Sequence, residues 1–321
     1  MSYKYRAMVS WGCGDRPGVP VDVLKSGLQK YARRRCVDKM LFCCWKLHEM
    51  HARTGESADP RAGSVGKGVR TNMVNRLRIV LEEDVLFAEV YVHNTAHDLL
   101  ETYLGGGDFE NVSKVCVLIC GARLLRLNSD VNCFFRAYAA PAPGDPVAHA
   151  LRCVDGRDPT AYGHALQLLA ASDAPRAQRK NTPVYRFFRG LLEIAAAEPP
   201  AVTRAAHIRF GEFDRGERLE RKFFLLGAVS LLMHAHLAND ASPGTLETWT
   251  PRPPPLWVDI DSFVVDMHTS AGRRAGMDGR DFGEDGAFIL DEDTQFLNPE
   301  WRAFYRHCKG LPAYTKKVRR E

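Results

Sequence analysis

Residues 19–34 read VPVDVLKSGLQKYARR, and this stretch shows most clearly how the chain folds. Its apolar residues recur at spacings of three and four, which places them on one face of a helix with 3.6 residues per turn. Asp22 falls in the first turn, where a carboxylate complements the positive end of the helix dipole. The pattern predicts an amphipathic helix whose buried face consists of Val21, Leu24, Leu28, Tyr31 and Ala32.

Helical periodicity continues along most of the chain, whereas the alternating pattern of β-strands is scarce. We therefore expect a mostly α-helical fold, a helical bundle with few or no strands. The stretch 54–70, rich in Gly, Ser and Pro, and the polar sequence around Pro199 and Pro200 are expected to be loops. Further helices are expected at residues 37–51, 71–80, 83–103, 112–126, 159–171, 184–197 and 217–237.

Breaks in this pattern suggest three parts. Proline interrupts the helices at residues 141–146, and a run of prolines at 251–255 forms a stiff, extended connector. We expect an N-terminal helical domain resembling a clamp-loader collar at residues 1–140 and a second helical region at 141–250. The third part, residues 251–321, contains the connector, a segment rich in Asp, His, Arg and Gly, and a basic tail.

The composition excludes several classes of protein. The chain has 321 residues, 45% of them hydrophobic, with 44 basic and 39 acidic side chains, which suits a protein with a hydrophobic core and not a disordered one. No apolar stretch reaches the roughly 20 residues of a membrane helix, and the first residues do not read as a secretory signal. Nine cysteines without a CxxC pair indicate free thiols in place of disulfides or a zinc finger. We expect an intracellular protein without membrane contact, cofactor or metal.

Basic side chains gather on the polar face of the first helix. The ridge consists of Ser26, Gln29, Lys30, Arg33 and Arg34, and Lys25 belongs to the same basic segment. Arg76 and Arg78 form a second basic group, followed by the acidic residues 82–84. An exposed ridge of this kind can bind a phosphodiester backbone or an acidic protein surface. The alternatives are a solvated helix face for the ridge and an ion-pair network for the two arginines.

Four short motifs follow one another along the chain. They are LQKYARR at 28–34, NRL at 75–77 with EDV at 83–85, DMHT at 266–269 with Gly272, Arg273 and Gly276, and EDGA at 284–287. In this order they resemble the C-terminal region of the RarA family of AAA+ proteins, also called MgsA, which includes the Werner-helicase-interacting protein. Stand-alone relatives occur in phages and large DNA viruses. Ala32 and Asp285 depart from the family pattern, and residues 54–70 look like an insertion.

The resemblance implies an oligomeric helical fold like the clamp-loader collar and a role in DNA replication or recombination. It does not extend to ATPase activity, because the nearest stretch to a Walker A loop, residues 63–68, lacks the required spacing and hydroxyl residue. We therefore expect a non-catalytic accessory protein that forms homo-oligomers and binds DNA or a replication protein, such as an ATPase, a polymerase or a single-strand-binding protein. The expected contact residues are Lys25, Gln29, Lys30, Arg33, Arg34, Arg76, Arg78 and Arg273.

The DMHT segment also has a chemical interpretation of its own. Asp266 and His268 could coordinate a divalent ion together with nearby aspartates at 259 and 261. The flanking arginines supply counter-charges, which favour a hydrogen-bonded structural knot over a metal site. We expect this knot to include Asp266, His268 and Glu284.

Two other functions fit parts of the sequence. His93, His97 and Asp98 resemble the centre of the HD phosphohydrolase motif, with His48 or His51 as the earlier histidine. The second alternative is a structural or scaffold protein of a virus or phage that keeps the fold without the replication role.

Overall fold

The computed structural model describes residues 9–310, except 11, 13, 56–59, 136, 137, 173–175, 217 and 252. For residues 54, 55, 60–65, 176–178, 218, 219 and 310 it describes the backbone alone. These parts of the chain form α-helices joined by turns and short 3-10 segments, and they contain no β-strand beyond isolated bridges such as Val85 with Leu124. The expectation of a mostly α-helical fold is confirmed.

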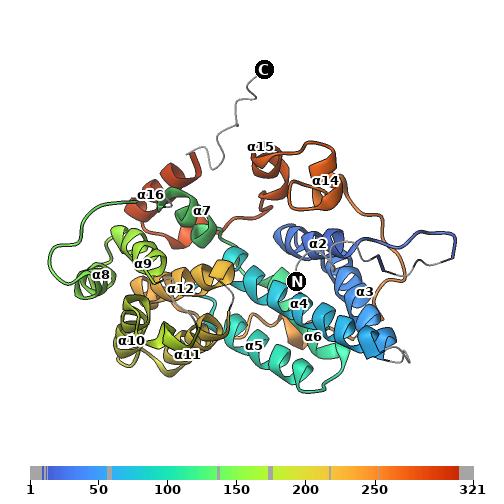
Figure 1. Cartoon of the computed structure of the whole chain (residues 1–321), viewed down its shortest axis with the longest axis horizontal. Coiled ribbons are helices and arrows are strands. Elements are labelled where there is room, and N and C mark those ends of the chain that lie inside the picture. Colours follow the sequence, from blue (N-terminus) through green and yellow to red (C-terminus); the bar gives the residue numbers. More distant parts are fainter. Residues whose placement is uncertain are drawn as a thin grey trace.

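Helices α2–α6 form one half of the molecule, on the right in Figure 1. The first of them occupies the stretch that the periodicity predicted, and Leu24 and Leu28 on its apolar face are completely buried. Burial of such a side chain contributes roughly 1.5–3 kcal/mol. The bounds are α2 (Val21–Arg33), α3 (Val37–Gly55), α4 (Pro60–Asp84), α5 (Val90–Leu104) and α6 (Phe109–Gly121).

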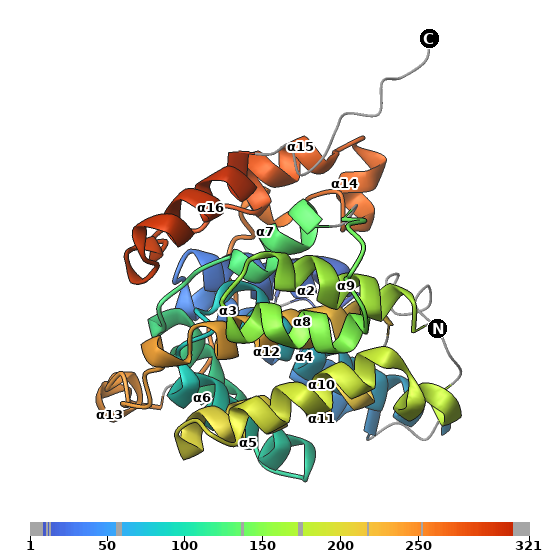
Figure 2. The ribbon, with the colours of Figure 1, turned by 90° about the vertical axis from the view of Figure 1, so that its left-hand side faces the viewer.

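The other half, which faces the viewer in Figure 2, consists of a second group of packed helices. Helices α8 (Pro146–Asp155), α9 (Thr160–Ala170) and α10 (Pro183–Ala195) lie in front in Figure 2, and α12 (Arg218–Met233) packs behind them and contacts α4. The bounds are α7 (Leu127–Phe134), α8 (Pro146–Asp155), α9 (Thr160–Ala170), α10 (Pro183–Ala195), α11 (Pro200–Arg215) and α12 (Arg218–Met233).

The last part of the chain returns across both halves, and its helices α14 (Ser270–Arg274), α15 (Gly279–Asp281) and α16 (Pro299–Gly310) lie at the top of Figures 1 and 2. Trp257 packs on Phe42 with ring centroids 5.8 Å apart, and Val264 is buried beside α2. One π-helical turn, η5 (Phe282–Gly286), follows. The bounds of the remaining helices are α13 (Thr245–Thr248), α14 (Ser270–Arg274), α15 (Gly279–Asp281) and α16 (Pro299–Gly310).

Buried apolar side chains form two clusters. The N-terminal core lies among α2–α6 and includes Val264 and Ile289, and the C-terminal core lies mainly among α7–α12 and α16. Helix α4 joins them, because Leu77 belongs to the first and Ile79 to the second. The expected division at residues 140 and 250 stays a prediction. Of the helices that the structure describes, none combines the length and apolarity needed to cross a membrane.

The stretch 54–70 differs from the expected loop. Helix α3 extends to Gly55 and α4 already begins at Pro60, and residues 56–59 lie outside the described part. Packing overrides the low helix propensity of glycine here, since Val69 is buried in the N-terminal core and Arg70 donates a hydrogen bond to the Tyr103 carbonyl. Proline fits the first turn of a helix, where its missing N–H costs nothing.

The region after Pro199 also differs, because it forms helix α11 and not a polar loop. Its buried positions include Val202, Ala206 and Phe213, spaced as on one helix face. Arg209 and Glu212 are buried on the same side, and these charged residues hid the periodicity in the sequence. Helix α5 likewise begins at Val90 and not near residue 83, because residues 85–89 form a buried connection without helical structure.

Candidate functional site

The polar face of α2 is covered by the C-terminal part of the chain. Lys30 Nζ lies 2.6 Å from Asp266 Oδ2 and donates a hydrogen bond to the Val264 carbonyl at 3.0 Å. Both charged side chains are only 3% exposed. Burial lowers the pKa of Lys30 from 10.5 to about 8, although Asp266 opposes this shift. Burial by itself would raise the pKa of Asp266, but hydrogen bonds from His268 and Lys30 outweigh it and lower that pKa below its ordinary value.

Arg33, one turn further along α2, makes a second buried contact. Its Nε donates to Asp84 Oδ1 at 2.9 Å, and its Nη1 donates to the Gly286 carbonyl. Arg126 Nε lies 3.6 Å from the same carboxylate oxygen, so one fully buried aspartate faces two guanidinium groups. Burial lowers the pKa of Arg33, and Asp84 opposes that shift. We call the five residues Lys30, Arg33, Asp84, Arg126 and Asp266 the α2 network.

Three predicted contact residues lie along the seam between α2 and α4. Lys25 Nζ donates to Asn72 Oδ1 at 3.2 Å, and Arg76 Nη1 donates to Gln29 Oε1 at 3.5 Å. The amide of Gln29 also donates to the Glu83 carboxylate. Lys25, Gln29 and Arg76 are all half-buried, so part of each side chain remains at the surface.

Arg34 and Arg273 lie nearer the C-terminal part of the chain. The guanidinium carbon of Arg34 lies 3.8 Å from the centroid of the Phe263 ring, and its Nη2 donates to the Asp285 carbonyl at 2.6 Å. Arg273 is exposed and donates to the His268 carbonyl at 2.9 Å. Both side chains therefore hold loops together while keeping some contact with solvent.

The expectation of a continuous exposed ridge on α2 is wrong. Lys30 and Arg33 are 2% and 1% exposed, because the segment carrying Asp266 and Gly286 lies over them. Arg78, on α4, is also buried. A helix shows which residues share a face, but not whether a segment more than 200 residues away covers that face. The binding role of the remaining predicted residues stays a prediction.

Asp266 and His268 lie together as the knot hypothesis requires. Asp266 accepts hydrogen bonds from the backbone N–H of His268 at 2.8 Å and from its Nδ1 at 3.1 Å. Thr269 Oγ1 caps α14 by accepting from the Gly272 N–H. Glu284 lies apart from this group, since its carboxylate accepts a hydrogen bond from Arg280 at the exposed surface.

A second group of buried charges lies between α4, α5 and α11. Arg78 donates to Glu101 and its Nε lies 3.3 Å from Glu212 Oε1, while His97 Nε2 lies 3.5 Å from the same Glu212 oxygen. The hydrogen bond from His97 and the neighbouring arginines outweigh burial and lower the pKa of Glu212. A cavity of about 130 Å³ opens beside Arg78, Glu212 and Arg215.

Of the residues in the phosphohydrolase hypothesis, His97 and Asp98 lie together, with His97 Nδ1 3.7 Å from Asp98 Oδ1, whereas His93 and His48 lie against other partners. His93 is buried with its Nδ1 3.6 Å from Glu82, whereas the exposed Asp98 accepts two hydrogen bonds from Arg204. His48 lies in the N-terminal half, where its Nδ1 is 2.8 Å from the Tyr103 hydroxyl. His93, Asp98 and His48 therefore contact different partners.

Sequence reasoning missed Arg126, a member of the α2 network, and Arg209, which forms a separate buried pair with Glu82. Arg126 was expected at the end of a buried helix, and Arg209 lies in the helix that was not anticipated. Arg209 Nε donates to Glu82 Oε2 at 2.9 Å. The signal in the sequence was the charged residue itself, because it stands at a position that would be apolar on the buried face of a helix.

Comparisons with known proteins add no relative. No family model matches the chain, and neither a curated protein nor a solved structure is significantly similar to it. The resemblance to the RarA family thus remains a hypothesis that depends on the four motifs and on where they lie in the fold.

Proposed function

We propose that this protein is a non-catalytic accessory protein of DNA replication or recombination, related to the C-terminal region of the RarA family. In this role it forms oligomers and binds DNA or a replication protein. The observation behind the proposal is that the family motifs meet at the α2 network. LQKYARR supplies Lys30 and Arg33, EDV supplies Asp84, DMHT supplies Asp266, and EDGA supplies the Gly286 carbonyl.

Contact between these motifs is informative because they are far apart in the sequence. Arg33 of the first motif and Gly286 of the last are separated by 253 residues, yet a hydrogen bond joins them, and Lys30 forms an ion pair with Asp266 of the DMHT motif. Short motifs that matched by chance would have no reason to lie against one another. Their contacts support the interpretation that they form one structural unit, as the resemblance implies.

The contact surface in this proposal is the seam between α2 and α4. Buried charges of the α2 network cannot reach a partner, whereas Lys25 and Arg76 keep part of their surface in solvent on neighbouring helices. Two partly exposed cations on neighbouring helices can contact the phosphates of a nucleic acid or the carboxylates of an acidic protein.

Titration of labelled single-stranded and forked DNA, followed by fluorescence anisotropy, tests the proposal. We expect binding that weakens with salt, and a Lys25→Glu/Arg76→Glu variant that loses affinity for both DNA forms, with a salt slope smaller by about two units. Arg186→Glu/Arg189→Glu, which changes two exposed arginines of α10, is the matched control and should bind as the unaltered protein does.

Light scattering on the same samples gives the oligomeric state. Absence of DNA binding at low salt would refute the DNA-binding form of the proposal, and a monomer at all concentrations would refute oligomerisation. Co-purification with virus or phage particles in place of replication proteins would favour the structural-protein alternative.

A further inference from the structure

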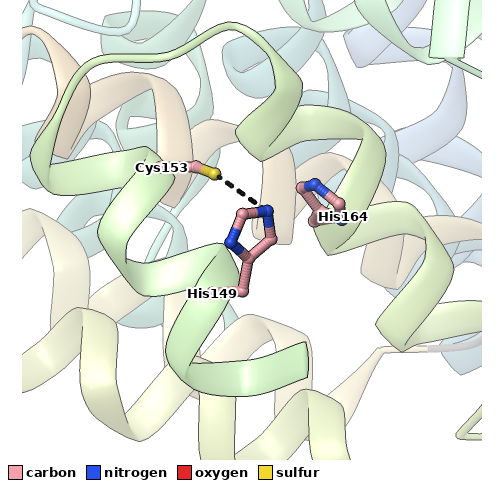
Figure 3. Close-up of side chains that lie close together, drawn as sticks. All are labelled: His149, Cys153 and His164. Atoms are coloured by element: carbon pink, nitrogen blue, oxygen red, sulfur yellow. Dashed lines mark hydrogen bonds between the residues drawn. The ribbon is translucent and has the colours of Figure 1, made fainter. Parts of the chain in front are cut away.

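Three side chains with metal-binding chemistry meet between α8 and α9 (Figure 3). His149 and Cys153 are four residues apart on α8 and therefore lie on the same side of that helix, and His164 approaches from α9. One potential ligand atom of each residue lies within 4.8 Å of those of the other two. From this arrangement we infer that His149, Cys153 and His164 bind one Zn²⁺ ion.

The observed separation of sulfur and nitrogen fits a tetrahedral ion. Zinc lies about 2.3 Å from cysteine sulfur and about 2.0–2.1 Å from histidine nitrogen, so the two ligand atoms of a tetrahedral site are about 3.6 Å apart. Cys153 Sγ lies 3.7 Å from His149 Nε2. Two nitrogens on one ion are about 3.4 Å apart, so His164 has to shift by little more than about 1 Å.

The hydrogen bonds of Gln167 set the protonation of His164. The amide nitrogen of Gln167 donates to the carbonyls of Tyr138 at 3.3 Å and Ala140 at 3.1 Å, so its oxygen is the acceptor that faces His164 Nδ1 at 3.2 Å. His164 Nδ1 therefore carries the proton, and Nε2 keeps the lone pair that a metal needs.

Neighbouring groups complete the surroundings of the site. Thr160 Oγ1 donates towards Cys153 Sγ at 3.7 Å, a contact that stabilises a thiolate. The Tyr138 hydroxyl lies 3.3 Å from His164 Nε2 and has to rotate away when the metal binds. Cys153 and His164 are buried, whereas His149 is half-buried and provides the route from solvent. When Zn²⁺ binds, the Cys153 thiol releases its proton to solvent.

A second cluster of potential ligands, His97, Glu101 and Glu212, is less suited to a cation. Arg78 and Arg215 already pair with both of its carboxylates. An ion there would displace these guanidinium groups or lie against them, whereas in the described part of the chain no ion pair engages the ligands between α8 and α9. The chemistry of one thiolate and two imidazoles also suits zinc better than magnesium or calcium.

The ion would cross-link α8 to α9, and its fourth coordination position would remain for water or another ligand. Spacing alone gave a weak signal, because His149 and Cys153 are four apart but His164 follows on a separate helix. The inference does not depend on the proposed role in replication.

Titration of the metal-free full-length protein with Co²⁺, followed by competition with Zn²⁺, tests the site. We expect about one equivalent of Co²⁺ to produce tetrahedral d–d bands and a thiolate-to-cobalt charge-transfer band, and Zn²⁺ to abolish both. Cys153→Ser should remove the charge-transfer band and weaken Zn²⁺ binding by more than about 100-fold. This loss is larger than the loss expected when only a hydrogen bond to a metal ligand is removed.

Two matched controls separate this site from other groups. His97→Gln/Glu101→Gln alters the competing cluster, and Cys36→Ser removes a half-buried thiol elsewhere, so both variants should keep the spectrum. If Cys153→Ser fails to fold, His149→Asn, at a half-buried position, should weaken binding instead. A folded wild-type protein without the charge-transfer band, or a band that persists in folded Cys153→Ser, would overturn the inference.

Discussion

Replacement of Asp84 by asparagine tests whether the α2 network holds the fold together. The change preserves the size of the side chain but removes the charge that faces Arg33 at 2.9 Å and Arg126 at 3.6 Å. Loss of one partner from a buried ion pair destabilises a protein by about 3–5 kcal/mol, because the other charge is left in a low-dielectric interior. Since the free energy of unfolding of a domain is only about 5–15 kcal/mol, Asp84→Asn should remove a large part of the total stability.

Urea unfolding followed by circular dichroism measures this change. Asp98→Asn is the control, because Asp98 pairs with Arg204 where both side chains are about half exposed, and there we expect a cost below about 1 kcal/mol. Arg33→Met/Asp84→Leu removes the Arg33–Asp84 pair and leaves only Arg126 without this carboxylate, whereas Asp84→Asn leaves two guanidinium groups without it, so the double variant should cost less than Asp84→Asn alone. A cost of Asp84→Asn below about 1 kcal/mol, or a double variant as unstable as the sum of its single variants, would refute the reasoning.

Three further predictions concern other parts of the fold. Gly227→Ala should cost about 1–3 kcal/mol in urea unfolding, because the added Cβ would overlap the buried Glu82 carboxylate. Burial lowers the pKa of His234 to about 3, so the unfolded chain takes up a proton below about pH 6.5 while the folded chain does not. Stability should therefore fall by about 2 kcal/mol from this residue between about pH 6.5 and pH 5, and His234→Gln should lose that part of the pH dependence. Arg157 has φ of 55°, so Arg157→Gly should raise the melting temperature by relieving about 1 kcal/mol of strain. Arg35 has the same φ, but its guanidinium donates to the Cys120 and Ala122 carbonyls, so Arg35→Gly should lower that temperature.

Much of the helical structure could be predicted because the relevant signal is local. The periodicity of residues 19–34 gave α2 almost to the residue, and α9 and α10 also lie where it placed them. The same reasoning failed for α11, where Arg209 and Glu212 occupy positions on the buried face. These two residues look like surface residues in the sequence, because their partners Glu82 and Arg78 lie on another helix.

The candidate site could be predicted only in part, for a related reason. Lys30 and Arg33 were identified as members of one helix face, and their charges suggested a surface. Whether a charged face meets solvent or another segment depends on tertiary contacts, here with Asp266 and Gly286. The order of the motifs identified the segments that meet, but only the three-dimensional structure showed that their charged and polar groups pair with one another.

The position of these contacts in the chain also has a consequence for synthesis. Lys30 finds its hydrogen-bond partner at Val264, 234 residues later. A ribosome adds about 5–20 residues per second, so roughly 10–50 s pass before this partner exists. During that interval the nascent chain carries the uncovered polar face of α2, and the N-terminal core lacks Val264 and Ile289. Helix α2 thus reaches its final surroundings only after the segment that carries Val264 has been made.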